Sequence, residues 1–374
     1  MSIEIREVDS HRKLKQFVCF AHKLYKNHPF YVPSLLKGEM STLSPKSNPA
    51  FEHSDTLFLM AFEGGRMVGR IAGIINHQYI EQWNKKDARF CWFDTIDDPE
   101  VSRILFERIE KWAADKGMER VVGPMGFTTF ERQGILIKGF DEMPTFAGCY
   151  NYPYYSEHLK LLGYEREIQY VEYELIVPQE VPGKIENISK LIQERYKLRI
   201  AEAKRTRDML PYAPQVFRVI NASSKPLYGF TILTDKQIDY FVKRFFIFMR
   251  PDFVSAVLDQ QDQVLGFQIS MPSLSKALQK AKGRLLPFGW FHLWKAMRKP
   301  ERLDTLLTGV LPEYQQRGIN AVFMTHLTRS AIRAGIKYAE SNGELAENIK
   351  VQNTWRYFDK RQHRRSQIVA KNIS

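Results

Sequence analysis

Residues 315–321 combine polar side chains, a glycine and a small residue in a way that suits phosphate binding. They follow an apolar run that ends at Val310 and precede a helical pattern that continues to Gly335. The first N–H groups of a helix have no partner within it and lie at the positive end of its dipole, so they attract anionic oxygens. A glycine lets a ligand approach the main chain closely. The sequence therefore predicts a phosphate site here; the alternative is a plain strand-to-helix connection.

Other familiar chemistries find little support in the sequence. No Ser/His/Asp grouping and no dinucleotide fingerprint stands out, which argues against a hydrolase or a dehydrogenase. The three cysteines, Cys19, Cys91 and Cys149, are far apart and lack the spacing of metal ligands. No metal site is predicted, and the cysteine pattern fits a reducing compartment.

Two segments with the same plan supply the elements that would position the phosphate site. Residues 57–75 contain two apolar runs around a Glu-Gly-Gly-Arg turn, and residues 254–269 repeat this pattern, which is typical of a hairpin. A strand, a helix that ends at glycine and another strand follow each hairpin. In the second copy the helix is expected at 320–335 and the last strand at 337–340. The alternative is coincidence between two common hairpin-helix-strand units.

The repeat predicts two domains, and 374 residues with 44% hydrophobic content supply a core for each. We place the boundary near residues 178–183, where prolines and a glycine interrupt the regular pattern. The expected domains are residues 1–178, without a phosphate loop, and residues 184–374, which carry it.

An insertion from about 272 to 302 distinguishes the second copy from the first. It combines aromatic side chains, Trp290 and Trp294 among them, with a cluster of lysines and arginines. Such a mixture suits a helix on an anionic membrane surface or at the mouth of a lipid-binding cleft. The alternative is that the aromatic side chains pack on the sheet as ordinary core and the cations face water.

The positive charge is concentrated in the second half of the chain. The net charge is +13, and residues 188–374 hold 32 Lys and Arg against 15 Asp and Glu. Such a field attracts a phosphate-bearing cofactor, anionic lipid or nucleic acid. Nucleic acid is the weakest of these readings, because no recognised nucleic-acid module accompanies the cations at 197–207 and 360–365.

The beginning of the sequence lacks a charged segment followed by an apolar run, and no apolar stretch reaches the length of roughly 18 residues that a bilayer requires. The sequence therefore predicts a cytoplasmic protein, with peripheral membrane contact through the insertion as the further expectation.

The order of strand, Gln-x-x-Gly-x-small and helix at 306–321 resembles the acyl-CoA pyrophosphate loop of the GNAT family of N-acyltransferases. The family usually has Gly or Ala where this chain has Asn320, with Ala321 one place later. Asn tolerates a left-handed conformation, so the turn is expected to survive. The resemblance implies an α/β (α+β) fold of two GNAT-like domains in tandem, each a mixed, mostly antiparallel sheet flanked by helices.

Further segments are similar to a bacterial group of YghO-like proteins related to bacterial ceramide synthases, and this likeness covers nearly the whole chain. The chain departs from the group at 341–348 and 361–365. The segments that carry the likeness are 67–72, 123–127, 139–141, 150–155, 162–164 and 283–290.

This resemblance implies lipid metabolism and an N-acyltransferase that moves an acyl group from acyl-CoA, or from an acyl carrier protein, to an amine. The acceptor that it suggests is a long-chain sphingoid base. The alternative is a protein that retains the GNAT fold and binds acyl-CoA, or regulates, without turnover.

Roles for individual residues follow from the needs of acyl transfer to an amine. Proton removal needs a carboxylate within reach, and Glu340, at the end of a predicted strand beside the loop, is the first candidate, with Glu344 next. The family pattern implies Tyr357 as the acid. Asn151, Tyr155 and Trp290 are expected to face the acceptor. The residues expected to hold acyl-CoA are Val310, Gln315, Gln316, Arg317, Gly318, Ile319, Asn320 and Ala321.

Overall fold

The first half of the chain forms the predicted hairpin, helix and strands. The computed structural model describes residues 2–373. The helix predicted after Asp98 is α4 (Pro99–Asp115), and the Asp98 side chain caps it by accepting a hydrogen bond from the Glu100 amide. The elements of this half are β1 (Ile3–Glu7), α1 (His11–Leu24), α2 (Leu36–Thr42), β2 (Ser54–Glu63), β3 (Arg66–Asn76), α3 (His77–Trp83), β4 (Asp87–Thr95), α4 (Pro99–Asp115), β5 (Arg120–Gly123), β6 (Ile135–Lys138), α5 (Tyr154–Leu161) and β7 (Glu165–Ile176).

The second half repeats the plan, and the insertion forms a pair of helices, α9 and α10. The elements of this half are α6 (Gly183–Tyr196), β8 (Arg199–Ile200), α7 (Ala213–Ser224), α8 (Asp235–Phe245), β9 (Val254–Leu258), β10 (Val264–Pro272), α9 (Ser275–Ala281), α10 (Gly289–Arg298), β11 (Arg302–Val310), α11 (Ile319–Arg333), β12 (Tyr338–Ser341), β13 (Glu344–Leu345), α12 (Ile349–Gln352) and β14 (Lys360–Asn372).

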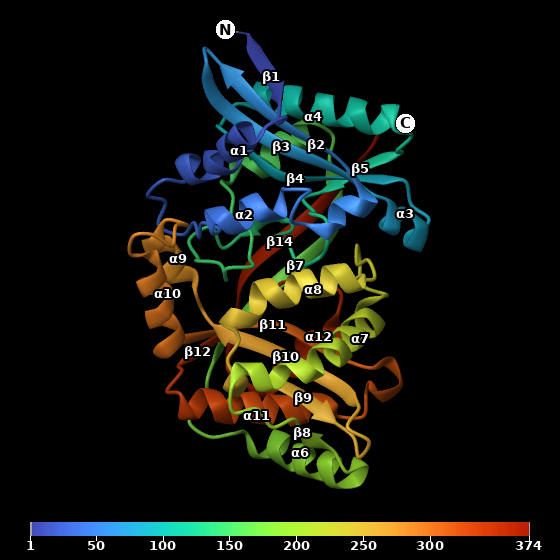
Figure 1. The fold of residues 1–374 in the computed structure, drawn as a ribbon, viewed down its shortest axis with the longest axis vertical. Helices are drawn as coiled ribbons and strands as arrows, with labels where there is room; N and C mark the ends of the chain where they lie inside the picture. Colours follow the sequence, from blue (N-terminus) through green and yellow to red (C-terminus); the bar gives the residue numbers. More distant parts are fainter. Residues whose placement is uncertain (1, 374) are drawn as a thin grey trace.

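The strands of both halves form one continuous sheet (Figure 1). Its order is β1-β2-β3-β4-β5-β14-β7-β12-β11-β10-β9-β8, with β6 and β13 paired to β14 and β7. Most pairs are antiparallel, whereas β4–β5 and β11–β12 are parallel, so the predicted mixed, mostly antiparallel fold class is confirmed. From the sequence, one sheet is expected for each domain. The joining of the two sheets into one is not part of that prediction.

The junction is an exchange of the last strands. β7 ends the first half but pairs with β12, and β14 ends the chain but pairs with β5 (Figure 1). The two exchanged strands also pair with each other along most of their length. The predicted boundary at 178–183 lies between β7 and α6. Whether residues 1–178 and 184–374 are separate domains stays a prediction.

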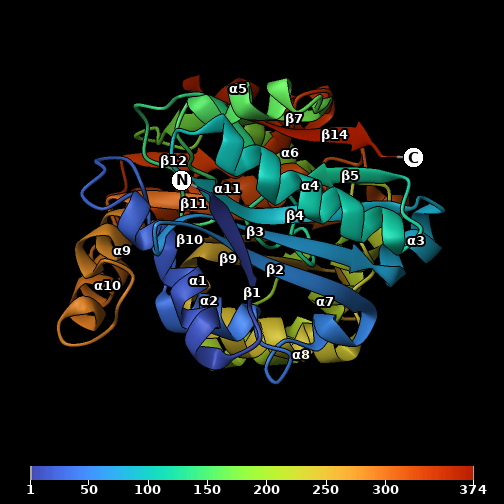
Figure 2. The same ribbon diagram turned by 90° about the horizontal axis from the view of Figure 1, so that it is seen from above.

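Helices cover both faces of the sheet (Figure 2). In the first half, α4 packs Val101, Leu105 and Ile109, which share one side of the helix by their spacing, on one face of the sheet. Helix α1 packs on the other face. In the second half, α11 lies on one face and α7 on the other. This arrangement leaves the α7 side of the second half facing the first half, where the site described below is found.

None of the helices within residues 2–373 has both the length and the apolar composition needed to cross a bilayer. The same residues contain no cluster of three or more His, Cys, Asp or Glu side chains arranged to hold a metal ion.

Candidate active site

The predicted phosphate loop is an exposed turn with free main-chain N–H groups. Between β11 and α11, Gln316 and Gly318 adopt left-handed conformations, with φ values of 63° and 83°. Within residues 2–373, no oxygen accepts a hydrogen bond from the amides of residues 316–320. Gln315, Gln316, Arg317 and Asn320 are exposed. Five consecutive free amides at the start of a helix form a site suited to a diphosphate.

The other predicted loop residues shape this turn. Gly318 suits the left-handed conformation of this turn, and a Cβ there would lie 3.1 Å from Cγ1 of Ile192 in α6, a tight contact. Arg317 lies over the ring of Tyr314, with 5.1 Å from its Cζ to the ring centroid. The side chain of Gln315 donates to the carbonyl of Val310 at 3.2 Å, while Ile319 is buried and Ala321 bonds back to Gly318.

The strand before the loop has an open edge. β11 and β12 pair from Arg302 and Tyr338 to Thr305 and Ser341, and then they separate because β13 pairs with β7 instead. Leu306 is the extra residue of a bulge, with no partner in β10. The edge of residues 306–310 that faces away from β10 therefore has no strand partner in the described part of the chain, and an extended ligand has main-chain groups available there.

A pocket of about 190 Å³ lies between the halves, next to this open edge. Leu306 and Leu307 line it, as do Asn342 and Gly343 at the point where the chain leaves β12. The rest of its wall comes from α7, α8 and the 129–149 segment of the first half, and most of these side chains are apolar. The pocket suits an acyl chain or another long apolar group.

Two carboxylates, the half-buried Glu131 and the buried Glu172, interrupt the apolar wall. Glu131 accepts hydrogen bonds from the amide and the hydroxyl of Thr128 at 2.7 and 2.8 Å. Glu172 accepts one from Nε of Arg364 at 3.0 Å. Burial raises the pKa of both carboxyls, while the Arg364 guanidinium opposes the rise for Glu172. Neither residue was predicted from the sequence, because Glu172 alternates with apolar residues along β7, a pattern that favours a solvent-facing side chain.

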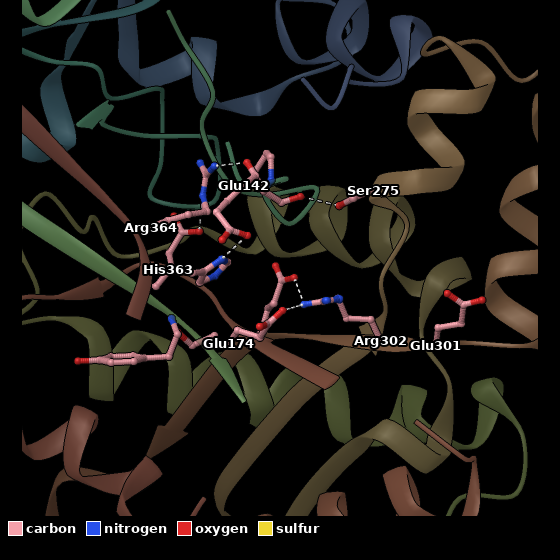
Figure 3. A network of polar contacts seen from close by, with 12 residues as sticks. Glu142, Glu174, Ser275, Glu301, Arg302, His363 and Arg364 are labelled. Atoms are coloured by element: carbon pink, nitrogen blue, oxygen red, sulfur yellow. Dashed lines mark hydrogen bonds and ion pairs between the residues drawn. The ribbon is translucent and has the colours of Figure 1, made fainter. Parts of the chain in front are cut away.

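Glu340 lies in a buried cluster of charged groups close to the pocket. Figure 3 shows Arg302 and Glu174 of this cluster. It is paired in register with Asp304 of β11, so both side chains project from the same face of the sheet. Arg302 lies between Glu340 and Glu174 and donates to each at 2.5 Å. Glu340 precedes the pocket-lining Asn342 by two residues, which places this cluster at the base of the opening between β11 and β12.

The pKa values of this carboxylate pair are near neutrality. Burial raises the pKa of Glu340 to about 8, and Asp304 adds to the rise while Arg302 opposes it. Burial likewise raises the pKa of Asp304 to about 7, and hydrogen bonding by Ser273 and by the Phe146 main chain opposes the rise. Groups that titrate near the working pH are suited to accept and return a proton.

Replacing Asp304 with asparagine should make stability less dependent on pH. Below its folded-state pKa, Asp304 is protonated in the folded protein and ionised in the unfolded chain, so the free energy of unfolding falls as the pH rises to about 8. The slope in Asp304→Asn should be shallower by up to about 1.4 kcal/mol per pH unit. Urea unfolding from about pH 6.5 to about pH 8 measures it; unfolded histidine, with a pKa of about 6.5, titrates equally in both proteins and cancels in the difference between their slopes.

The exposed Asp115 of α4 provides the matched control. Asp115→Asn should leave the slope of the wild-type protein unchanged. If Asp304→Asn also follows the wild-type curve, the carboxyl of Asp304 does not titrate in this range.

Like Glu340, the two other predicted catalytic residues lie outside the pocket wall. Glu344 accepts a hydrogen bond from the indole of Trp355 at 2.6 Å, and burial raises its pKa to about 7. Tyr357 packs beside α6 and α11, and its hydroxyl accepts from Arg356. The structure does not test either role, so base and acid functions for these residues stay predictions.

The three predicted acceptor contacts are dispersed. Tyr155 is buried in the first half, where its hydroxyl accepts from Tyr25 and from the Thr95 amide at 2.9 and 3.0 Å. Asn151 accepts from the Leu136 amide at 2.7 Å. Trp290 lies exposed on α10. None of the three lines the pocket, and the positions of Asn151 and Tyr155 favour structural roles.

The basic run at 360–365, from which nucleic-acid binding was considered, lies in a central strand. Arg364 is fully buried and holds the 139–149 segment, donating to the carbonyls of Glu142 and Cys149. Arg361 forms ion pairs with Glu142 and Glu174. These two arginines are therefore engaged within the protein.

No family model matches the chain. Protein YghO of Escherichia coli is 26% identical over 374 residues, covering 96% of this chain and 93% of YghO. The bacterial ceramide synthase of Caulobacter vibrioides is 26% identical over 334 residues, covering 84% of this chain and 83% of that enzyme.

Solved structures with the same fold include a tandem GNAT protein from the clavulanic acid biosynthesis pathway. It superimposes with a TM-score of 0.58 at 10% identity and covers 100% of this chain and 99% of its own. A GCN5-related N-acetyltransferase from Sphaerobacter thermophilus gives a TM-score of 0.51 at 9% identity, with 99% and 96% covered. The resemblance expected from the sequence is thus confirmed: the chain has the tandem GNAT fold and is similar, over most of its length, to YghO and to a bacterial ceramide synthase.

Proposed function

We propose that this protein transfers an acyl group from acyl-CoA to an amine. The observation that carries the proposal is the contiguity of three features: five free amides in the 316–320 loop, the open edge of β11, and the apolar pocket beside Leu306 and Leu307. Together they match the three parts of an acyl-CoA, namely the diphosphate, the extended pantetheine arm and the acyl chain.

The direct reaction needs few groups. The amine nitrogen bonds to the thioester carbonyl carbon, the carbon–sulfur bond breaks, and the departing thiolate takes up a proton. We assign removal of the amine proton to Glu340, paired with Asp304, because burial raises the pKa of both carboxyls toward neutrality. Glu172 connects this pair with the pocket: it lines the pocket, and its charge contributes to the raised pKa values of Glu340 and Asp304.

For the acceptor, we propose a long-chain amine of the sphingoid-base class. The apolar wall of the pocket supports an acyl or alkyl chain, and the name of the Caulobacter relative points to ceramide synthesis. Incubating the protein with acyl-CoAs of graded length and a panel of amines that includes sphinganine, while following thiol release, tests both assignments. Acyl-CoA binding without thiol release for any amine would instead support the binding or regulatory alternative.

A change at Asn320 separates anion binding from folding. Asn320→Asp adds a negative charge to the first turn of α11, which favours the helix but repels the diphosphate. The dissociation constant for acyl-CoA should rise by about tenfold or more, since an effect of about 1.4 kcal/mol suffices, while the thermal midpoint stays level or rises. Calorimetric titration and a thermal melt measure the two effects.

Asn187→Asp provides the control, because it makes the same change at an exposed position near the start of α6, just after the first turn. It should leave acyl-CoA affinity unchanged. Equal affinities for the two variants would show that the diphosphate does not bind at the 316–320 loop.

A further inference from the structure

The insertion carries an apolar face that the rest of the described chain, residues 2–373, leaves exposed. Six large apolar side chains of α10 and the loop before it are 41–77% exposed. We call them the α10 patch: Leu285, Leu286, Phe288, Trp290, Phe291 and Trp294. The aromatic rings of α10 contact one another, with Phe291 and Trp294 stacked at a centroid distance of 5.8 Å. Single exposed apolar residues are common, whereas a contiguous group of this size marks an interaction surface.

The opposite side of α10 explains why the patch faces outward. Leu293 is buried and packs with Met271 of β10, Leu278 of α9 and Leu306 of β11. The helix is thus fixed by its inner side, and the core alternative considered from the sequence is wrong for Trp290, Phe291 and Trp294. In both views, α9 and α10 lie at the margin of the molecule, and in Figure 2 they project from its side.

Unpaired cations surround the patch. Residues 272–300 contain no acidic residue. Lys280, Lys282, Arg284, Lys295, Arg298 and Lys299 are exposed, and none forms an ion pair with any residue in 2–373. Cζ of Arg298 lies 5.1 Å from the ring centroid of Trp294. Aromatic rings beside basic side chains match the two layers of a membrane surface, the acyl boundary and the anionic headgroups.

The first half offers an internal comparison. Its corresponding connection, between β3 and β4, is the short α3, in which Tyr79 is buried and Trp83 donates to the carbonyl of Phe230. Aromatic residues at this point of the repeat do pack inward in the first half. The outward aromatic face is therefore a property of the insertion and not of the fold.

We propose that the α10 patch and its cations dock the protein on an anionic lipid membrane. The occupant is the membrane surface and not a second protein, because the patch joins an exposed apolar face to six cations without ion pairs in residues 2–373. The position also has a consequence for access: Met271 and Leu306, against which α10 packs, line the pocket as well. Docking on α10 places the wall of the pocket beside the lipid surface.

Sedimentation with vesicles tests the docking without any turnover, so its result is independent of the proposed function. The full chain is mixed with vesicles of phosphatidylcholine alone or of phosphatidylcholine with phosphatidylglycerol. Binding is expected only to the anionic vesicles and should weaken as salt is added. Trp290→Gln/Trp294→Gln and, separately, Lys295→Glu/Arg298→Glu should each reduce the bound fraction at least about tenfold, given the interfacial preference of Trp and the headgroup attraction of Lys and Arg.

The control removes two exposed leucines from other helices, Leu161→Gln/Leu191→Gln, and should bind like the wild-type protein. Thermal midpoints verify that all variants are folded. Failure of the wild-type protein to bind anionic vesicles overturns the proposal, as does binding by both α10 variants that equals that of the wild-type protein. A dimer in sedimentation velocity that the tryptophan variant dissociates, without vesicle binding, overturns it in favour of a second copy.

Discussion

Replacing Glu340 with glutamine is expected to lower kcat for acyl transfer by about a hundredfold to ten-thousandfold, the usual contribution of a general base. The amide has nearly the shape of the carboxyl but cannot take a proton from the amine. The binding loop at 316–320 lies at the far end of β11, so acyl-CoA affinity should change by less than about threefold. Initial rates of thiol release give kcat, and calorimetry gives the affinity.

The pH profile distinguishes a base from a structural carboxylate. Burial raises the pKa of Glu340 to about 8, so the rate of the wild-type enzyme should rise with pH until Glu340 is ionised. In Glu340→Gln this limb should disappear. Glu174→Gln is the matched control, because Glu174 contacts the same Arg302 at the same distance; it should keep the limb. Retention of the limb in Glu340→Gln, or an equal loss of rate in the control, would exclude Glu340 as the base.

The loop and its flanking elements could be predicted because their signals are local. An apolar run up to Val310, a glycine at 318 and helical spacing beyond it lie within thirty consecutive residues, and the structure has β11 and α11 at these positions. Glu340 could be chosen for the same reason: it ends a short strand that follows this helix.

The rest of the site depends on contacts between residues that are distant in sequence. Arg364 bonds to Glu172 across 192 positions, and a run of cations gives no sign that one of them is fully buried. The exchange of β7 and β14 is likewise a matter of pairing between strands, for which hairpin and helix patterns carry no information. One clue was available: Asp304 interrupts a buried apolar strand, where an ionised carboxylate is costly.

The position of the acyl chain leads to the last prediction, which concerns Ala213 at the start of α7. Its side chain lines the pocket, so Ala213→Trp places an indole in the space we assign to the chain. Displacing about four methylenes costs about 3 kcal/mol. That corresponds to a loss of about a hundredfold in kcat/KM. The loss should appear with palmitoyl-CoA, whereas acetyl-CoA, which does not reach this part of the pocket, should be affected by less than about threefold.

Ala222→Trp is the matched control on the same helix. It lies nine residues further along α7, which is half a turn away from Ala213, and it does not line the pocket. Comparing kcat/KM along a series of acyl-CoAs for the three proteins shows the chain length at which the indole begins to interfere. Equal losses for the long and short donors in Ala213→Trp would mean that the pocket receives the amine and not the acyl chain. The open edge of β11 would then have to direct the thioester toward another face of the sheet.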